Sequence, residues 1–392
     1  MSNQLFFRFV MITILIKTVI MTQNSAEYNA IDERNCDSQC ENDSKPCDCS
    51  VDNSTVHRTH HNQPPVRFNS NGTLKIVQFT DLHYGQFPES IGPEDDYNST
   101  RVMRDILEME QPDFVIFTGD LVTGDKMYPN VSEYIHMLLK PVVEKGYKWA
   151  SVYGNHDSAP NVSRHEIFRA EQSYGKLCYT SQADPSLPGV TNYFIPIYGP
   201  ENATITGKEK PVMVWWFFDS RGGRTVDGKV PEYVDDSVVE WFRNENSNIR
   251  SKWGQLPSLV FVHIPTREYV TMQQTIAENN LCSGLVDDAV TPQVKDSGFM
   301  RALLEAGGVR SMFVGHDHGN SWCCPYKGIE ICYNRHTGYG GYGEWTRGAR
   351  VIGLDVNHLQ EQTNYVRLET GEITDEFPPK QVDSLLASVL PQ

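Results

Sequence analysis

Five short motifs of aspartate, asparagine and histidine stand out between residues 81 and 318. In chain order they are Asp81-Leu82-His83, Gly119-Asp120, Gly154-Asn155-His156-Asp157, the single His263, and Gly315-His316-Asp317-His318. Carboxylate and imidazole ligands suit iron, manganese or zinc, and the absence of cysteine from the motifs argues against a structural zinc site. A ligand set of this size can hold two cations about 3.5–4 Å apart. The motifs therefore predict a dinuclear metal centre.

The spacing within two motifs suggests how two ions would share these ligands. One carboxylate must bridge the ions, because it balances their charge and fixes their separation. Asp120 is the candidate, since the glycine before it lets the backbone turn sharply beneath the ions. In the last motif, His316 and His318 would send two imidazoles to two ions from a single loop, and Gly315 would relieve crowding there.

The segments before these motifs predict how the chain positions them. Short β-rich runs occupy residues 74–80, 114–120, 150–157, 212–219, 258–265 and 311–317. Segments with apolar residues at three- and four-residue spacing occupy residues 100–110, 132–145, 163–175 and 235–253. This alternation predicts an α/β fold whose sheet faces are covered, with its site at the strand ends. One Asp or His at a strand end is usually a cap or a core residue, but five in succession are hard to explain in that way.

The pattern of apolar and polar residues in the rest of the chain suggests one catalytic domain. Later β-rich runs at residues 329–333, 349–356 and 365–368 have less helix between them and predict a β-rich closing half. The chain has 392 residues, 39 % of them hydrophobic, which is typical of a globular protein. With no internal repeat, we assign residues 73–370 to one domain and residues 371–392 to a surface tail. The net charge of −16 argues against nucleic acid as a partner.

The N-terminal segment predicts export. Residues 1–26 have an uncharged apolar run only at 9–16, whereas a membrane-spanning helix needs about 20 apolar residues, so a cleaved signal peptide is favoured over an anchor or a buried helix. No later stretch is apolar enough to span a membrane. Seven Asn-x-Ser/Thr sequons agree with export and N-glycosylation: Asn42, Asn53, Asn71, Asn98, Asn130, Asn161 and Asn202. We expect a secreted protein or one in the lumen of the endomembrane system, such as a lysosome or vacuole.

Cysteine usage points the same way. Residues 27–72 read as an irregular lead-in that carries four clustered cysteines, Cys36, Cys40, Cys47 and Cys49. Disulfides in an oxidising compartment explain this cluster better than a metal knuckle, because no flanking histidine completes a zinc-finger spacing. Three further cysteines follow the last histidine pair and should pin that loop by a disulfide: Cys323, Cys324 and Cys332.

In type and order, the five motifs resemble the D-x-H, G-D, G-N-H-[DE], H and G-H-x-H motifs of the calcineurin-like metallophosphoesterase superfamily. The segment GHDHGNSWCCPYKGIEICY (315–333) also resembles the branch related to purple acid phosphatases, in particular the 16-, 28- and 29-like group of plants, with relatives in fungi. The resemblance covers roughly residues 74–368. It implies a sandwich of mixed β-sheets flanked by helices, in four layers α/β/β/α, and two divalent or mixed-valence ions of iron, manganese or zinc.

The same resemblance assigns roles to the motif residues. It places Asp81, His83 and His318 on one ion and Asn155, His263 and His316 on the other, with Asp120 bridging. His156 would protonate the leaving group, and Asp157 would orient its imidazole. The chain departs from the purple enzymes at one position, since Thr123 stands where they have a tyrosine ligand and His83 supplies a nitrogen instead. We therefore expect no tyrosinate-to-iron colour, and a ferric site is placed in doubt.

These roles imply hydrolysis of phosphate monoesters by a metal-bridging hydroxide, with a small molecule or a phosphoprotein as substrate. The first alternative is a phosphodiesterase or nucleotide pyrophosphatase, because the same metal core serves both. The second is a catalytically silent secreted glycoprotein that keeps the scaffold for binding. That alternative predicts eroded ligands, and none of the motif residues is missing. Neither a G-x-S-x-G elbow nor a G-x-x-x-x-G-K-[ST] phosphate loop is present.

Other residues could touch a substrate, but each also has a structural interpretation. The aromatic run at residues 215–218 could form a substrate wall, although an aromatic strand usually belongs to the core. The glycine- and tyrosine-rich segment 336–345 is a candidate for the rim of the site. Arg164 or Arg267 could hold a phosphate oxygen, but either is more simply a surface charge.

Overall fold

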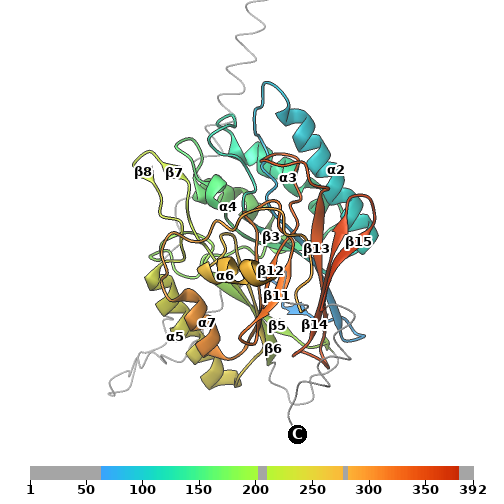
Figure 1. The fold of residues 1–392 in the computed structure, drawn as a ribbon, viewed down its shortest axis with the longest axis vertical. Helices are drawn as coiled ribbons and strands as arrows, with labels where there is room; N and C mark the ends of the chain where they lie inside the picture. The colour runs from blue at the N-terminus through green and yellow to red at the C-terminus, as the bar shows by residue number, and fades with distance from the viewer. Residues whose placement is uncertain (1–62, 202–209, 277–280, 379–392) are drawn as a thin grey trace, which may run out of the picture. The chain divides into compact units, whose positions relative to one another are not determined.

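The computed structural model of the protein describes residues 63–201, 210–276 and 281–378. These residues form two large mixed β-sheets with helices outside both of them (Figure 1). The α/β fold predicted from the sequence, a sandwich of mixed sheets flanked by helices, is confirmed.

One large sheet has six strands in the order β15-β14-β13-β2-β3-β4. Their bounds are Ile373–Phe377 for β15, Gln362–Leu368 for β14, Gly348–Asp355 for β13, Thr73–Phe79 for β2, Phe114–Thr118 for β3 and Lys148–Val152 for β4. Strands β2, β3 and β4 run parallel, whereas β13 lies antiparallel to β2.

The other large sheet has seven strands in the order β1-β5-β6-β9-β10-β12-β11. Their bounds are Val66–Arg67 for β1, Tyr193–Tyr198 for β5, Pro211–Phe218 for β6, Ser258–Val262 for β9, Val309–Val314 for β10, Ile329–Tyr333 for β12 and Cys323–Tyr326 for β11. Strands β6, β9, β10 and β12 are parallel neighbours. A small hairpin, β7 (Arg224–Thr225) and β8 (Gly228–Lys229), stands apart from both sheets.

Helices cover the outer face of each sheet. Those that pack on the six-stranded sheet are α2 (Gly92–Glu110), α3 (Val131–Glu144) and α4 (Arg164–Gln172). Those that pack on the seven-stranded sheet are α5 (Asp236–Trp253), α6 (Arg267–Thr275) and α7 (Phe299–Ala306). Short 3₁₀ turns are η1 (Asn155–Asp157) and η2 (Gly175–Leu177). None of the described helices is long and apolar enough to cross a membrane.

The aromatic strand β6 shows how the layers are built. Trp215 and Phe217 lie in the apolar layer between the two sheets, whereas Trp216 and Phe218 face the helices, as the two-residue period of a strand requires. All four side chains are buried, so the run at 215–218 belongs to the core, as predicted. In the inter-sheet layer, Phe217 stacks on Phe261 of β9 with ring centroids 5.2 Å apart. Across the layer, Trp215 packs edge to face on Phe114 of β3 in the other sheet, with ring centroids 5.3 Å apart.

The structure extends the predicted domain at both ends. Strand β1 lies inside the predicted lead-in and pairs with β5, and strand β15 lies inside the predicted surface tail and pairs with β14. Helix α2 begins eight residues before the predicted start, because its first turns bury polar residues such as Asp96 and Ser99 and show no apolar period. Helices α6 and α7 were not predicted. Helix α6 buries only Tyr269 and so shows no apolar period, whereas the apolar period of α7, which includes Phe299, Leu303 and Ala306, was overlooked.

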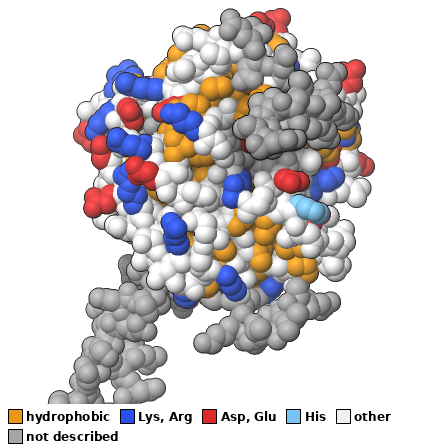
Figure 2. Space-filling model, turned by 60° about the horizontal axis from the view of Figure 1, so that its bottom comes forward, with side chains coloured by type: hydrophobic (Ala, Val, Ile, Leu, Met, Phe, Trp, Pro, Cys, Tyr) orange, Lys and Arg blue, Asp and Glu red, His pale blue; other side chains and the backbone are white. Residues whose placement is uncertain are grey.

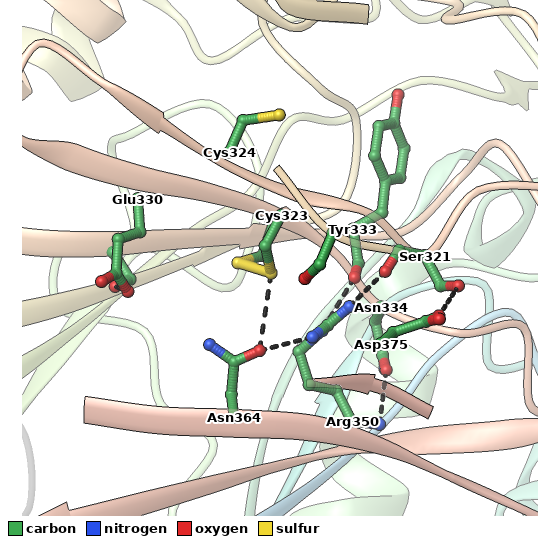
Figure 3. The surroundings of a disulfide bond; sticks show 12 residues. Ser321, Cys323, Cys324, Glu330, Tyr333, Asn334, Arg350, Asn364 and Asp375 are labelled. Atoms are coloured by element: carbon green, nitrogen blue, oxygen red, sulfur yellow. Dashed lines mark hydrogen bonds between the residues drawn. A yellow bond between two sulfur atoms is a disulfide. The ribbon is translucent and has the colours of Figure 1, made fainter. Parts of the chain in front are cut away.

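Two disulfides brace the strands that follow the last motif, and Figure 3 shows the surroundings of the one at Cys323. Cys323 and Cys332 lie directly opposite each other on β11 and β12, and Cys282 bonds to Cys324. The predicted pinning of this loop by cysteine is therefore present in the structure. Beneath it, the fully buried guanidinium of Arg350 donates to the side chain of Asn364 and to main-chain carbonyls.

Acidic and basic side chains alternate on the face shown in Figure 2, and strips of apolar side chains lie between them. The net charge of −16 is therefore not gathered as a single acidic patch on that face. The cluster of cysteines at 36–49 and the predicted signal peptide lie outside the described residues.

Candidate metal centre

The five motifs meet at the carboxyl ends of strands from both sheets. Asp81 follows β2, Asp120 follows β3, and Asn155 follows β4, while His263 follows β9 and His316 follows β10. The loops after β3 and β9 touch directly, since a Cβ added to Gly119 would lie 2.5 Å from Nδ1 of His263. A side chain at Gly119 is thus excluded, which explains the glycine before Asp120.

Within this cluster, two sets of three residues offer ligand atoms within 4.8 Å of one another. We call Asp81, His83 and His318 the first ligand group, and Asp120, His263 and His316 the second ligand group. All six side chains are buried except that of His316, which is half-buried. Two adjacent sets of carboxylate and imidazole donors fit two cations of the first transition series.

Asp120 lies between the two groups. Its Oδ2 atom is 3.1 Å from Nε2 of His263 in its own group and 3.8 Å from Nε2 of His83 in the other. Asn155 stands beside the second group, with its Oδ1 atom 3.2 Å from Nε2 of His263. The structure therefore brings together all seven residues predicted as metal ligands.

Hydrogen bonds orient three of the imidazoles. Nδ1 of His83 lies 2.9 Å from Oγ1 of Thr123. Nδ1 of His263 lies 2.8 Å from the carbonyl of Thr118, and Nδ1 of His318 lies 2.9 Å from the carbonyl of Tyr342. Because a carbonyl can only accept, the second and third rings carry their proton on Nδ1 and keep the Nε2 lone pair for a metal.

The electrostatics of the site favour neutral imidazoles at three of the histidines and an ionised carboxylate at Asp120. Burial lowers the pKa of His83 well below its usual range, that of His316 to about 3 and that of His318 to about 4. Burial opposes the charge of Asp120, but the neighbouring histidines, His263 first, hold its pKa well below the usual range. Neutral imidazole and carboxylate are the forms that bind metal.

Two further groups show that this pocket suits positive charge. Burial raises the pKa of Asp81 to about 7, and the nearby charge of Asp120 raises it further against the opposing effect of His263. His263 shows the converse, because its contacts with Asp120 overcome burial and raise its pKa to about 10. A cation between the carboxylates would stabilise the ionised form of Asp81 and would displace the proton from His263.

The backbone at the ligands is strained. Asp81, His83, Asp120 and His316 have φ angles of 52°, 51°, 49° and 82°, in the left-handed region that residues with a side chain rarely adopt. Such conformations persist where the surroundings impose them, and they gather at functional sites. Their concentration at four of the motif residues is independent support for a functional centre.

A cavity of about 400 Å³ opens over the ligands. It is lined by His83, Gln86, Asp120, Thr123, His156, Thr291, His316, Asp317, His318, Gly341 and Tyr342. Gly341 and Tyr342 come from the segment 336–345, so the prediction that this segment forms part of the rim is confirmed.

Comparison with known proteins agrees with this geometry. The model of the calcineurin-like phosphoesterase family matches residues 74–320. The chain belongs to the calcineurin-like phosphoesterase family. Its fold also resembles that of a dimetal phosphatase from Danio rerio, with a TM-score of 0.50 and 12 % identity over 78 % of this chain and 99 % of that one.

Among curated relatives, two from Arabidopsis thaliana match most of this calcineurin-like phosphoesterase chain. "Probable inactive purple acid phosphatase 28" is 30 % identical over 74 % of this chain and 77 % of its own length. "Probable inactive purple acid phosphatase 14" is 28 % identical over 77 % of this chain and 79 % of its own length. The yeast "Phosphatase DCR2" is 28 % identical over 73 % of this chain and 52 % of its own length. The expected likeness to purple acid phosphatase relatives is thus confirmed.

His156 and Asp157, the predicted catalytic pair of this phosphoesterase, lie in η1 after β4. The side chain of His156 is exposed to the cavity, with its ring centroid 5.0 Å from that of His83, and its backbone N–H donates to Oδ1 of Asp120 at 2.7 Å. Asp157 differs from its predicted role. Its two carboxylate oxygens accept from the backbone N–H groups of Gly154, at 2.7 Å, and Val122, at 3.1 Å, so it shapes the loop rather than orienting the imidazole.

The two candidate phosphate-binding arginines do not reach the cavity. Arg164 is buried and donates to the carbonyls of Gly154, at 2.6 Å, and Gly222, at 3.2 Å, while its Nε lies 3.5 Å from a carboxylate oxygen of Asp219. It is therefore neither a phosphate ligand nor a surface charge. Its hydrogen bond to the carbonyl of Gly154 holds the loop that carries Asn155. Arg267 is exposed and donates to a main-chain carbonyl, as expected of a surface residue.

Sequence reasoning missed the residues that support the ligands. Thr123 was noted only as the replacement for a tyrosine, yet it is buried and bonds to His83. Asp317, between the two histidines of the last motif, accepts from the hydroxyl of Tyr333 at 2.6 Å and from the backbone N–H of Thr291. No local pattern could have identified either role, because each partner lies in a different loop or strand.

Proposed function

We propose that this phosphoesterase binds two metal ions and hydrolyses phosphate monoesters. The observation that carries the proposal is the position of Asp120, whose Oδ2 atom lies within 4 Å of an imidazole nitrogen of each ligand group. A single carboxylate shared between two ligand sets is what a dinuclear site requires. Iron, manganese and zinc all suit the donors.

The residues divide into three roles. The first ligand group would hold one ion, the second group together with Asn155 would hold the other, and Asp120 would bridge them. Bound ions would supply Lewis acidity and would lower the pKa of water, so that hydroxide is available near neutral pH. His156 faces the cavity and is not part of either ligand group, which leaves its imidazole free to protonate the departing oxygen.

Activity is proposed although three of the curated relatives are named as probably inactive. Every motif residue is present in this chain, and each predicted ligand lies in the cluster. A protein that had kept only the scaffold for binding would be free to lose them. The retained strain at four ligand residues also argues against a purely structural centre, because it would cost stability without benefit.

The test combines metal analysis with two chromogenic substrates. We expect two metal ions per chain by mass spectrometry and faster hydrolysis of p-nitrophenyl phosphate than of bis-p-nitrophenyl phosphate. Asp120→Asn is the matched control, since it keeps the size of the side chain and removes the bridging charge. Faster hydrolysis of the diester would overturn the monoesterase assignment, and two bound ions without hydrolysis of either ester would show a silent binding protein.

We also propose that the chain is exported, starts near residue 27 when mature, and carries N-glycans. Sequon residues Asn71, Asn130 and Asn161 are exposed, which supports access for glycosylation. N-terminal sequencing of secreted protein, with and without enzymatic removal of N-glycans, tests both points. Recovery of an unglycosylated intracellular chain that still begins at Met1 would contradict them.

A further inference from the structure

Tyr342, on the rim of the cavity, contacts the ligand His318 at three points. Its carbonyl accepts from Nδ1 of His318 at 2.9 Å, and its hydroxyl oxygen accepts from the backbone N–H of His318 at 3.0 Å. The two rings are stacked, with centroids 4.0 Å apart and an angle of 12° between their planes. The rings of the buried His336 and His83 also lie close to the His318 ring, with centroids 3.8 and 5.0 Å away. The metal-binding imidazole is thus packed among three rings.

The same tyrosine links its own loop to a second loop near the cavity. Its hydroxyl donates to Oδ2 of Asp288, which belongs to the loop between α6 and α7. That loop is itself fixed by the Cys282–Cys324 disulfide. A parallel link lies beside it, where Nε1 of Trp345 donates to Oδ2 of Asp287 at 2.7 Å. Of these two side-chain hydrogen bonds, the first is made by a residue that also hydrogen-bonds to His318, whereas Trp345 packs against the ring of Tyr342, with centroids 6.2 Å apart.

The second ligand group is supported differently. Nδ1 of its His263 bonds to the carbonyl of Thr118 at the end of the buried strand β3, and His263 is fully buried. In the first group, by contrast, both histidines bond through Nδ1 to residues that line the cavity, Thr123 and Tyr342. A substitution at the rim should therefore change the metal affinity of the first ligand group and leave the position of His263 unchanged.

We propose that Tyr342 is a positioning residue for the first ligand group, and that its hydrogen bond to Asp288 couples the rim of the cavity to metal affinity at that group. The proposal rests on the proposed function in one respect, namely that both groups bind metal. The partner that orients an imidazole ligand typically changes metal affinity by about 10–100-fold when it is removed.

The test titrates metal-free protein with Mn²⁺ at buffered free concentrations and measures bound metal per chain. Electron paramagnetic resonance distinguishes a lone Mn²⁺ ion from a coupled pair. Tyr342→Phe removes the hydroxyl and keeps the ring stack, and Asp288→Asn removes the acceptor charge across the rim. Asp287→Asn is the matched control, because it alters the neighbouring link that does not reach His318. The unfolding temperature of each metal-free variant checks that the fold is intact.

We expect Tyr342→Phe to raise the free Mn²⁺ needed for the second ion and to accumulate the lone-ion signal, but by less than the about 10–100-fold that loss of a direct imidazole partner causes, because the main-chain carbonyl that bonds to Nδ1 of His318 remains. Asp288→Asn should act in the same direction, and Asp287→Asn should stay within about twofold of wild type. Thr123→Val, which removes the partner of the other histidine in the group, should reproduce the lone-ion signal.

Three results would overturn the proposal: wild-type titration of Tyr342→Phe, equal weakening of both ions, or equal effects of the two aspartate substitutions. These results are separable from failure of the proposed function, since only metal is measured. A wild-type protein that binds two ions but hydrolyses no ester would contradict the function and leave the role of Tyr342 standing. If the wild-type protein hydrolyses esters but its Tyr342→Phe variant binds metal normally, the proposed function stands and the role of Tyr342 is contradicted.

Discussion

Removing the imidazole of His156 should slow hydrolysis according to how strongly the leaving group needs a proton. In His156→Ala the backbone N–H that donates to Asp120 remains, and the lost side chain belongs to neither ligand group. The substitution therefore removes a proton donor from the cavity while leaving the predicted ligands in place. We expect metal content to stay within about twofold of wild type.

The size of the effect follows from the leaving group. An alkyl alkoxide is strongly basic, so loss of a general acid should cost about 10²–10⁴-fold in rate, or about 2.7–5.4 kcal/mol in the transition state. A p-nitrophenolate leaves almost unaided and should lose far less. Because the His156 side chain is exposed to the cavity rather than packed in the core, no comparable loss of folding stability is expected.

The assay measures kcat/KM for an alkyl phosphate and for p-nitrophenyl phosphate, with bound metal determined on the same samples. His165→Ala serves as the control, since that histidine is exposed on α4 and does not line the cavity. Equal losses on both substrates, accompanied by loss of metal, would show that His156 only supports the ligand loop. The argument for general-acid catalysis would then fail.

Three further predictions address the ligands and the fold. Asp120→Asn should lower activity and metal content more than His83→Ala, because it weakens both groups rather than one; similar residual values would count against the bridge. Purified protein should show no visible tyrosinate–iron band, since Thr123 replaces the tyrosine; a purple preparation would refute this. Burial raises the pKa of Asp96 to about 7, against the opposing effect of the hydrogen bond from the N–H of Gly85. The folded state therefore binds this proton more tightly than the unfolded state does. Folding stability consequently falls as the pH rises from about 4 to 7. A difference of about three in pKa corresponds to at most about 4 kcal/mol of folding stability. Asp96→Asn should therefore resist urea better than wild type at pH 8 but not at pH 4. Equal effects of the substitution at the two pH values would contradict the assignment.

The sequence was sufficient to predict the cluster of candidate ligands because two local signals coincide at five of them. A ligand-type residue follows a β-rich run at Asp81, Asp120, Asn155, His263 and His316, and parallel neighbouring strands end at one edge of a sheet. Strand direction therefore converts five distant positions into one cluster. The glycine before Asp120 added a third signal, which the close approach of His263 explains.

The supporting residues could not be predicted in the same way. Arg164 is the first residue of α4, a position where a charged side chain is ordinarily solvated, and only the loop at Gly222 and the buried Asp219 draw it inside. Tyr342 was predicted to lie on the rim, but its contacts with His318 and Asp288 depend on three loops meeting. Such contacts leave no periodicity in the sequence.

Thr123, which stands where the purple enzymes have a tyrosine ligand, should affect the choice of metal rather than only remove a ligand. The threonine hydroxyl lies 2.9 Å from Nδ1 of His83, whose Nε2 faces the other ligands of the first group. By the resemblance to purple acid phosphatases, a neutral nitrogen donor would replace the anionic phenolate of those enzymes. The remaining anionic donors of the cluster are Asp81 and Asp120, which together supply two negative charges against two cations. Each charge removed from the donor set disfavours a trivalent ion more than a divalent one, because the attraction scales with ionic charge. The donor set consequently favours two divalent ions, and metal analysis of the purified protein should find manganese, zinc or ferrous iron rather than a ferric centre.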